Sequence, residues 1–387
     1  MHEIIRSNYP LIDGLAIQQG IDSLNTSWGK KRNQYKLKCE NLLARTLDRK
    51  YCLMVSHGTG ALIVALKALG VKKDTKVGVP SLTWVSCASS IILAGGIPVF
   101  IDVDPNSFCI DQKALNQIKE NNIKYVIGVN LLGNLISDEI IKELKNLNVK
   151  IIEDSAESLG ASLKNGKKSG SLGDISCLSF HATKIITAGQ GGAVLTDDHK
   201  LFERLKSLSH HGINSKISGK YYWSNELGYN FSISDFQCAL ISAQIPFLKK
   251  RADHLKSIYL NYESIILNEY KYKFLSLMPK LHDQNQVFWL PLTTFNKNIY
   301  EGKESLNSLR EKMVKGGETF GVEIRPCFYP LHKMPTFEKY YNINPTNLNF
   351  TEDISYKHFA LPSGAGFKLE MTEIALERIY SCYSQLK

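Results

Sequence analysis

The sequence predicts an α/β protein with a mostly parallel sheet and a smaller α+β domain at its C-terminal end. Short apolar segments alternate with helical patterns, and this alternation gives way to a long helical pattern near residue 235. The length of 387 residues, 43% of them hydrophobic, suffices for more than one domain. We therefore expect a large α/β domain over residues 1–245, a small α+β domain over residues 246–387, and a linker near 245–255.

Seven short segments rich in valine and isoleucine are expected to be strands. Runs of this length with little polar content are typical of strands buried on both faces of a sheet. The segments are residues 51–56, 76–80, 97–103, 125–130, 149–154, 175–180 and 191–197. An Asn-Gly pair in KNGKK predicts a turn before the sixth of them.

Helical patterns separate the early strands, which favours parallel pairing with helices on both faces. The expected helices are residues 60–70, 83–95 and 136–148. The C-terminal part should contain a long helix from about 235, a segment QVFWLPL, a helix near 304–316, a segment VEIRPCFYP and a terminal helix near 368–385.

Composition excludes several function classes. The net charge of +10 is spread over distant clusters without a basic tail, which predicts a solvated surface and no nucleic-acid partner, although a small polyphosphate ligand remains open. No apolar run reaches the roughly 18 residues of a membrane span, and the N-terminal residues lack a signal-peptide layout, so we expect a soluble, cytoplasmic protein. Eight cysteines without a C-x-x-C pair predict reduced, buried thiols and no metal site.

Ligands in open α/β sheets bind beyond the carboxyl ends of the strands, and four of these ends carry unusual residues. Residues 56–60 (SHGTG) lead into a helix whose backbone N–H groups can hold a phosphate; a plain tight turn is the alternative. Trp84 offers a flat face to a planar ring, although core packing explains this residue better when it is taken alone. Asp154 ends another strand, where a helix N-cap explains it as well as function does.

The fourth end is the segment CLSFHATKIITAGQGGA (177–193), in which Lys184 stands between a β-prone run and a glycine-rich turn. A desolvated lysine amine forms Schiff bases with aldehydes, whereas a lone lysine is usually a surface residue. Together, a phosphate cradle, a flat aromatic ring, a carboxylate and a lysine describe a site for pyridoxal 5′-phosphate (PLP).

The order and spacing of these segments also resemble a known family. SHGTGAL, PSLTWVS, IIEDSAESLGA, GSLGDISCLSFHATKIITAGQGGAVLTDD and GYNFSISDFQCALISAQI resemble segments of the DegT/DnrJ/EryC1/StrS nucleotide-sugar aminotransferases, over nearly the whole chain. The resemblance implies a PLP enzyme of fold type I, with a seven-stranded sheet in the large domain. It also implies a homodimer whose active sites are built from both protomers.

The resemblance implies a role for each matching residue. Lys184 would form the covalent link to PLP, Asp154 would pair with the ring nitrogen, and Trp84 would stack on the ring. Glu157 would lie near the ring hydroxyl. The phosphate would be held by Gly58, Thr59 and Ser179, joined by Asn230 of the partner subunit. Because related dehydratases carry histidine in place of this lysine, its presence favours transamination.

The C-terminal segments narrow the expected substrate. Residues 322–337 and 355–367 look like the corresponding parts of GDP-perosamine synthases, a group that aminates C4 of GDP-4-keto-6-deoxymannose for surface polysaccharide (O-antigen) synthesis. L-glutamate is the implied amino donor. The substrate contacts would come from His181, Arg325, Tyr329 and His332. A salt bridge is the alternative role for Arg325, and a packed or capping histidine is the alternative for the two histidines.

Three positions depart from the family pattern and lie near the expected substrate side. Asn130 stands where histidine is common, Gln190 where an acid usually precedes the glycine pair, and Ser232 where arginine often follows the shared asparagine. These departures leave open a C4 or C3 aminotransferase for a UDP- or dTDP-linked keto-sugar. A PLP-binding regulator is disfavoured because no DNA-binding module is attached, and a nicotinamide oxidoreductase would need a full G-x-G-x-x-G.

Overall fold

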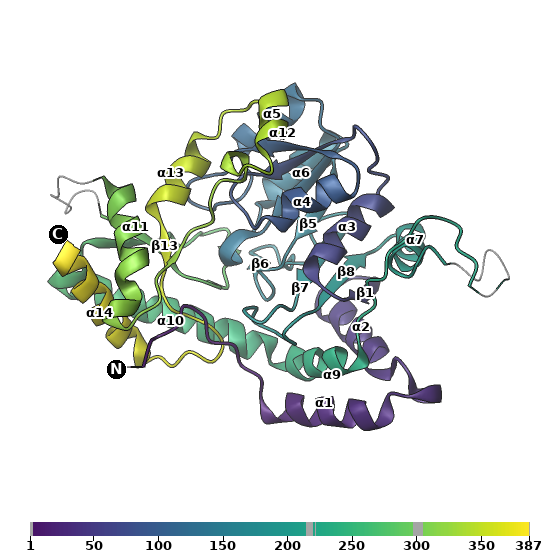
Figure 1. Ribbon diagram of the computed structural model, residues 1–387, viewed down its shortest axis with the longest axis horizontal. Helices are drawn as coiled ribbons and strands as arrows, with labels where there is room; N and C mark the ends of the chain where they lie inside the picture. Colours follow the sequence, from purple (N-terminus) through teal and green to yellow (C-terminus); the bar gives the residue numbers. More distant parts are fainter. Residues whose placement is uncertain (1–2, 214–219, 221, 297–304, 387) are drawn as a thin grey trace.

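The computed structural model describes residues 3–213, 220, 222–296 and 305–386, and its centre is a seven-stranded sheet (Figure 1). The strands are β1 (Tyr51–Val55), β2 (Lys76–Pro80), β3 (Ile97–Ile101), β4 (Tyr125–Val129), β5 (Lys150–Asp154), β7 (Ile175–Ser179) and β8 (Gly192–Thr196). Their order in the sheet is β1-β8-β7-β5-β4-β2-β3, and only β8 runs antiparallel to its neighbours. This confirms the predicted mostly parallel sheet.

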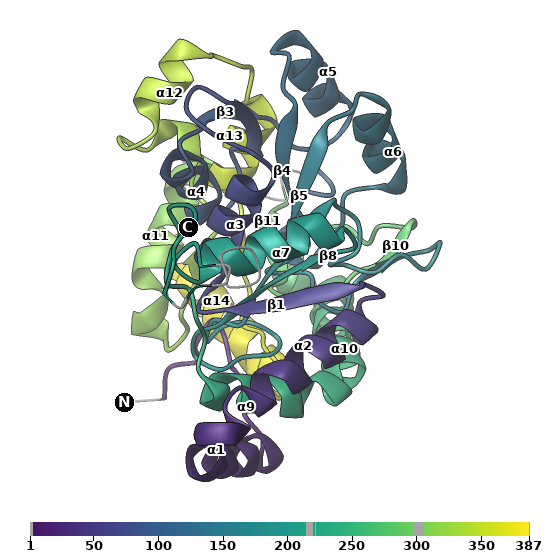
Figure 2. The same ribbon diagram turned by 90° about the vertical axis from the view of Figure 1, so that its right-hand side faces the viewer.

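Helices cover both faces of the sheet, because alternate side chains of each buried strand point to opposite sides. Cys52 and Met54 of β1 pack with α2, whereas Leu53 and Val55 share a core with α3 and α7 (Figure 2). The first face carries α2 (Gln34–Thr46), α5 (Gln112–Glu120), α6 (Asp138–Asn146) and α9 (Asp235–Gln244). The second carries α3 (Gly58–Ala68), α4 (Ser86–Leu93) and α7 (His199–Ser209). Helix α1 (Gly14–Thr26) packs outside, on α9.

The C-terminal part contains a second sheet of four short strands in the order β12-β13-β11-β9. These strands are β9 (Leu275–Leu277), β11 (Leu292–Phe295), β12 (Arg325–Pro326) and β13 (Phe359–Ala360). The helices around them are α10 (Leu248–Asn268), α11 (Leu306–Gly316), α12 (Glu338–Ile343), α13 (Asn349–Lys357) and α14 (Met371–Leu386). Residue 304, near which we expected α11 to begin, lies outside the described residues.

The boundary between the two parts differs from the expected linker. Residues 245–255 are helical, as a 3₁₀ turn at Ile245–Phe247 continues directly into α10. The N-terminal residues join the C-terminal part, since the Ile5 N–H donates to the Gly321 carbonyl at 2.8 Å. The proposed division at residues 245 and 246 therefore cuts a continuous helical segment, and it stays a prediction.

Two segments that we singled out in the C-terminal part are mostly irregular. QVFWLPL follows the two-residue strand β10 (Gln284–Asn285) as a turn in which Phe288 has a φ of 53°. VEIRPCFYP contributes only β12. A long-range contact accompanies the first turn: a Cβ on Gly133 would lie 2.7 Å from the Phe288 nitrogen, so glycine is needed at position 133.

All eight cysteines are buried and free of disulfide bonds, as predicted. Within the described ranges, no helix combines the length and the apolar character needed to cross a membrane.

Candidate active site

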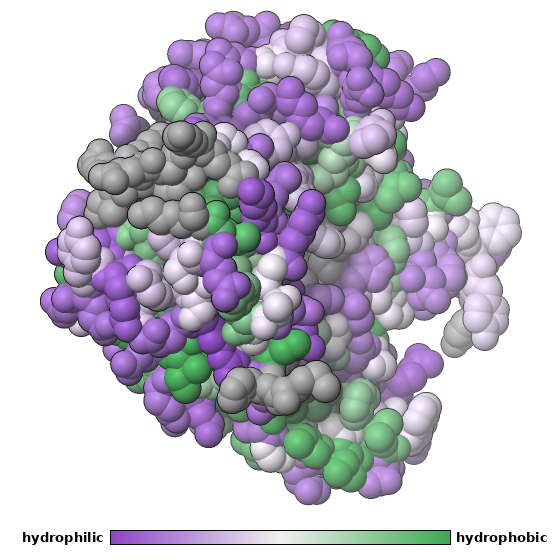
Figure 3. All heavy atoms as spheres, turned by 60° about the vertical axis from the view of Figure 1, so that its left-hand side comes forward, coloured by the Kyte–Doolittle hydropathy of each residue, from purple (hydrophilic) through white to green (hydrophobic). Residues whose placement is uncertain are grey.

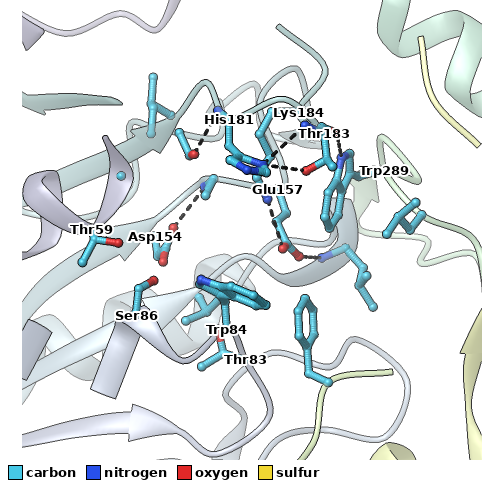
Figure 4. Close-up of a pocket in the computed structure, with 18 of the residues that line it drawn as sticks. Thr59, Thr83, Trp84, Ser86, Asp154, Glu157, His181, Thr183, Lys184 and Trp289 are labelled. Carbon is cyan, nitrogen blue, oxygen red and sulfur yellow. Dashed lines mark hydrogen bonds and ion pairs between the residues drawn. The ribbon is translucent and has the colours of Figure 1, made fainter. Parts of the chain in front are cut away.

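A cavity of about 530 Å³ opens at the carboxyl ends of the central strands (Figure 4). One wall is formed by the ends of β5 and β7 and by the segments that follow β1 and β2. The other wall is formed by residues 289–292 and 325–328 of the C-terminal part. The fold therefore brings the four predicted strand ends to one site, whose size suits a small organic ligand.

The amino end of α3 lies at this cavity. His57 caps the helix with Nδ1, which accepts the Gly60 N–H at 2.8 Å, and burial lowers the pKa of this imidazole. Gly58 lies against β7, where a Cβ would stand 3.0 Å from the Ser179 Cβ. Because the first N–H groups of a helix have no partner inside it, they can bind a phosphate together with the Thr59 and Ser179 hydroxyls. This cradle fits the phosphate of PLP.

The two adjacent carboxylates at the end of β5, Glu153 and Asp154, lie in different surroundings. Glu153 is fully buried on one side of the sheet, and its donors are Asn130, Ser155, Gly170, Leu172, Gly173 and Ser176. Asp154 lies on the other side and lines the cavity. Its Oδ1 accepts the Ala156 N–H at 3.1 Å, and its Oδ2 accepts the Cys87 thiol at 3.2 Å. Asp154 therefore caps no helix and is free to meet a ligand.

Lys184 reaches the cavity from the loop after β7, with 12% of its side chain exposed. Its Nζ lies 3.2 Å from the Glu157 Oε1 and 3.9 Å from the centroid of the Trp289 ring. Burial raises the pKa of the Glu157 carboxyl, while Lys184 and the Leu132 N–H, 3.1 Å from Oε2, favour its charged form. The amine is held between a carboxylate and an aromatic face, so Lys184 is not an ordinary surface lysine.

Trp289 was missed by the sequence analysis. Its Nε1 donates to the Thr183 carbonyl at 2.8 Å, which fixes the indole beside the loop that carries Lys184 (Figure 4). The only sequence signal was the aromatic run in QVFWLPL, a segment to which we assigned no functional role. The turn that aims Trp289 at the cavity depends on the distant Gly133, and a pattern in one segment cannot reveal such a contact.

Trp84 lies in the loop before α4 with 60% of its surface exposed, so core packing is the wrong interpretation. Its ring lines the cavity and meets Phe328 edge to face, with centroids 6.3 Å apart. An aromatic face open to the cavity fits a planar ring such as that of PLP. Stacking by Trp84 stays a prediction.

Two basic side chains, those of Arg325 and His181, line the cavity near the wall formed by the C-terminal part. The side chain of Arg325 is 41% exposed, and its Nη2 lies 3.6 Å from the Glu323 Oε1, so the salt-bridge alternative is present but leaves other N–H groups available. His181 is exposed, with Nδ1 3.3 Å from the Thr183 Oγ1. Partial desolvation by the cavity walls, followed by the charges of Lys184 and Arg325, lowers the pKa of His181 from its ordinary value. His181 is thus a neutral hydrogen-bonding group near pH 7.

His332 does not line the cavity, which corrects its expected contact with a sugar hydroxyl. Tyr329 does not line it either, and its expected contact with the sugar stays a prediction. His332 is 2% exposed, with Nδ1 2.7 Å from the Ser81 Oγ and Nε2 3.0 Å from the Glu352 Oε1. Both ring nitrogens are engaged, so the alternative of a structural histidine applies. Tyr329 instead contacts Arg310, whose guanidinium carbon lies 5.5 Å from the phenol centroid.

The three departures from the family pattern lie in different places. Gln190 lines the cavity. Asn130 does not, because its amide is buried in the Glu153 network, so our placement of this residue near the substrate was wrong. Ser232 and Asn230 are exposed and do not line the cavity of their own chain. The expected contact of Asn230 with the partner's cofactor stays a prediction.

The chain is similar to known proteins over nearly its whole length. Residues 11–379 match the DegT/DnrJ/EryC1/StrS aminotransferase family. The GDP-perosamine synthase of Caulobacter vibrioides is 30% identical over 384 residues, which cover 97% of this chain and 96% of that protein. A UDP-4-amino-4,6-dideoxy-N-acetyl-beta-L-altrosamine transaminase of Campylobacter jejuni is 36% identical over 233 residues, 58% of each chain. The PLP form of a putative sugar aminotransferase from Streptococcus pneumoniae has a TM-score of 0.85, with 21% identity over 99% of this chain and 100% of its own.

Proposed function

The chain belongs to the DegT/DnrJ/EryC1/StrS aminotransferase family, and we propose that it transfers the amino group of L-glutamate to C4 of GDP-4-keto-6-deoxymannose, giving GDP-perosamine. Family, fold, aminotransferase activity and dependence on PLP are as predicted from the sequence. The nucleotide, the sugar and a role in surface polysaccharide synthesis belong to the proposal. Full-length similarity to a perosamine synthase supports them.

The observation that carries the proposal is one cavity lined by Lys184, Asp154 and the amino end of α3. When bound there, PLP supplies an electron sink for the charge left when a C–H bond of the substrate ionises. The Asp154 carboxylate would pair with the ring nitrogen and favour its protonated form. The N–H groups of Gly58 and Thr59 and the Ser179 hydroxyl would hold the phosphate.

Lys184 is the general acid and base in this proposal. Its Nζ can take a proton from one carbon of the bound reactants and return it to another, since the side chain reaches into the cavity from a loop. Glu157, 3.2 Å away, orients the amine, and the Trp289 ring covers it from the other side. Both contacts exclude water from Nζ and hold the amine in position between proton transfers.

We propose that the nucleotide sugar binds at the wall formed by residues 289–292 and 325–328 of the C-terminal part. Arg325 binds an anionic oxygen of the nucleotide diphosphate with the N–H groups that Glu323 leaves available. His181, neutral near pH 7, donates to or accepts from a sugar hydroxyl. Both residues line the same cavity as Lys184, so a keto carbon and its nucleotide can be bound together.

We also propose a homodimer, in which Asn230 of the partner subunit completes the phosphate site. Exposed apolar side chains gather along α1, at the lower edge of Figure 3. They include Leu15, Ile17, Ile21 and Leu24, which are 49–54% exposed. Apolar patches of this kind are typical of protein–protein interfaces.

The alternative is an aminotransferase for a UDP- or dTDP-linked keto-sugar, which the similarity to a UDP-sugar transaminase supports. The test incubates the PLP-loaded protein and L-glutamate with GDP-, UDP- and dTDP-linked 4-keto-6-deoxy sugars, and locates the new amine by NMR. We expect turnover with the GDP sugar and an amine at C4. Turnover with only a UDP or dTDP sugar, or an amine at C3, would establish the alternative.

A further inference from the structure

We propose that the Cys87 thiol is a positioning residue that donates to the Asp154 carboxylate and holds it in a fixed orientation at the edge of the cavity; the inference rests on the proposed PLP-dependent function. Cys87 lies in the first turn of α4, is 0% exposed and does not line the cavity. Its Sγ lies 3.2 Å from the Asp154 Oδ2. The thiol therefore contacts the carboxylate from the protein side, where no ligand can reach it.

The Cys87 sulfur has a second polar neighbour besides Asp154. The Thr83 Oγ1 lies 3.3 Å from the Cys87 Sγ, so this sulfur is engaged on two sides. The second oxygen of Asp154 accepts the Ala156 N–H at 3.1 Å. Each carboxylate oxygen thus has one donor from the protein. Because a carboxylate can accept about four hydrogen bonds, acceptor capacity remains for a group in the cavity.

The charges around Asp154 explain why it needs such a donor. Burial raises the pKa of this carboxyl, and the neighbouring Glu153 raises it further. The Ala156 N–H, the Cys87 thiol and the charge of Lys184 oppose that shift. Glu157 adds a second carboxylate beside Lys184 in the same cavity. A charged Asp154 is therefore stabilised by only a few groups, and Cys87 is one of them.

Cys87 remains a hydrogen-bond donor at any physiological pH. Burial, and then the charge of Asp154, raise the pKa of its thiol well above the usual range. A thiol that does not ionise can neither repel the carboxylate nor react readily as a nucleophile. Without this donor, Asp154 would take up a proton at higher pH, and a neutral carboxyl pairs poorly with a protonated ring nitrogen.

The experiment compares PLP-loaded wild type with Cys87→Ala, Cys87→Ser and Cys109→Ser. Cys109 is a matched control, because it is equally buried and does not line the cavity. The measurements are the dissociation constant for PLP and the visible absorption of the bound cofactor as a function of pH. Cys87→Ala should weaken PLP binding roughly tenfold, the size of effect expected when a charged group loses a hydrogen bond. In this variant, the change of the absorption spectrum that occurs at acidic pH should move to higher pH.

The serine variant separates hydrogen bonding from packing. Cys87→Ser retains a donor and should bind PLP within about threefold of wild type, and Cys109→Ser should match wild type. An unchanged dissociation constant and pH profile in Cys87→Ala would overturn the proposal. Equal impairment of Cys87→Ala and Cys87→Ser would also overturn it, because the role would then be packing.

A further measurement does not depend on PLP. The infrared S–H band of Cys87, obtained in cofactor-free protein as wild type minus Cys87→Ala, should have the position of a hydrogen-bonded thiol and should shift in Asp154→Asn. A band at the position of a free thiol would overturn the proposal. A wild type that shows this hydrogen bond but binds no PLP would refute the proposed function and not the contact.

Discussion

The two walls of the cavity are built in different ways. Asp154 and Ser179 stand at the ends of adjacent parallel strands, whose main chains are joined in register. Arg325 belongs to a strand of two residues, and Trp289 to a turn in which Phe288 has a positive φ. The first wall is fixed by the sheet, and the second by single long-range contacts. We infer that Asp154 and Ser179 on the first wall serve the cofactor, whereas Arg325 on the second serves the substrate.

The most severe test of this comparison is Lys184→Ala, which removes the amine that we propose to link to PLP and to move the proton. We expect turnover to fall by more than about 10⁴-fold, because no other group replaces that amine. Circular dichroism and thermal melting should match wild type. Lys76→Ala, an exposed change at the opposite end of the sheet, is the control and should retain activity. Substantial turnover in Lys184→Ala would refute the assigned role.

Asp154→Asn should lower kcat by about 10²–10³-fold, the usual effect of removing one preorganised electrostatic group. The neighbouring Glu153→Gln provides the contrast. It places an amide NH₂ among hydrogen-bond donors and should lower the free energy of unfolding by about 2–4 kcal/mol. Urea denaturation and steady-state kinetics on both variants would show the difference. If Asp154→Asn lost stability and kept its kcat, the first wall would not have the role we give it.

The same contrast explains what the sequence could predict. The seven strands and the placement of Lys184 and Asp154 follow from local patterns, since buried strands are short apolar runs and their ends share one edge. Trp289 could not be found, because Gly133 and Thr183 determine its position from distant parts of the chain. His332 was misplaced for a similar reason: its orientation depends on Ser81 and Glu352.

A change on the second wall should affect substrate binding more than chemistry. Arg325→Gln should raise the KM for the nucleotide sugar about tenfold, since a charged hydrogen bond to phosphate is lost. The half-reaction with L-glutamate alone should keep its rate. Arg6→Gln, which removes an exposed pair with Glu318, serves as the control. An equal slowing of the glutamate half-reaction would mean that Arg325 binds the amino donor.

The smallest expected effect on activity comes from His332, which links the end of β2 to the C-terminal part. His332→Gln should lower the free energy of unfolding by about 1–3 kcal/mol and leave KM unchanged. Burial lowers the pKa of this histidine in the folded protein, so the unfolded state binds the proton more readily. Wild-type stability should therefore fall as pH drops below about 6.5, and less steeply in the variant. Thermal melts between neutral and mildly acidic pH measure both effects, and a raised KM would restore the substrate role.

The visible absorption spectrum of the purified, PLP-loaded protein, recorded before and after addition of L-glutamate, tests the central claim most directly. We expect an absorption band from cofactor linked to Lys184, which disappears when glutamate donates its amine and returns when a keto-sugar nucleotide is added. A protein that forms no such band with added PLP, or whose band does not respond to glutamate, would contradict the account.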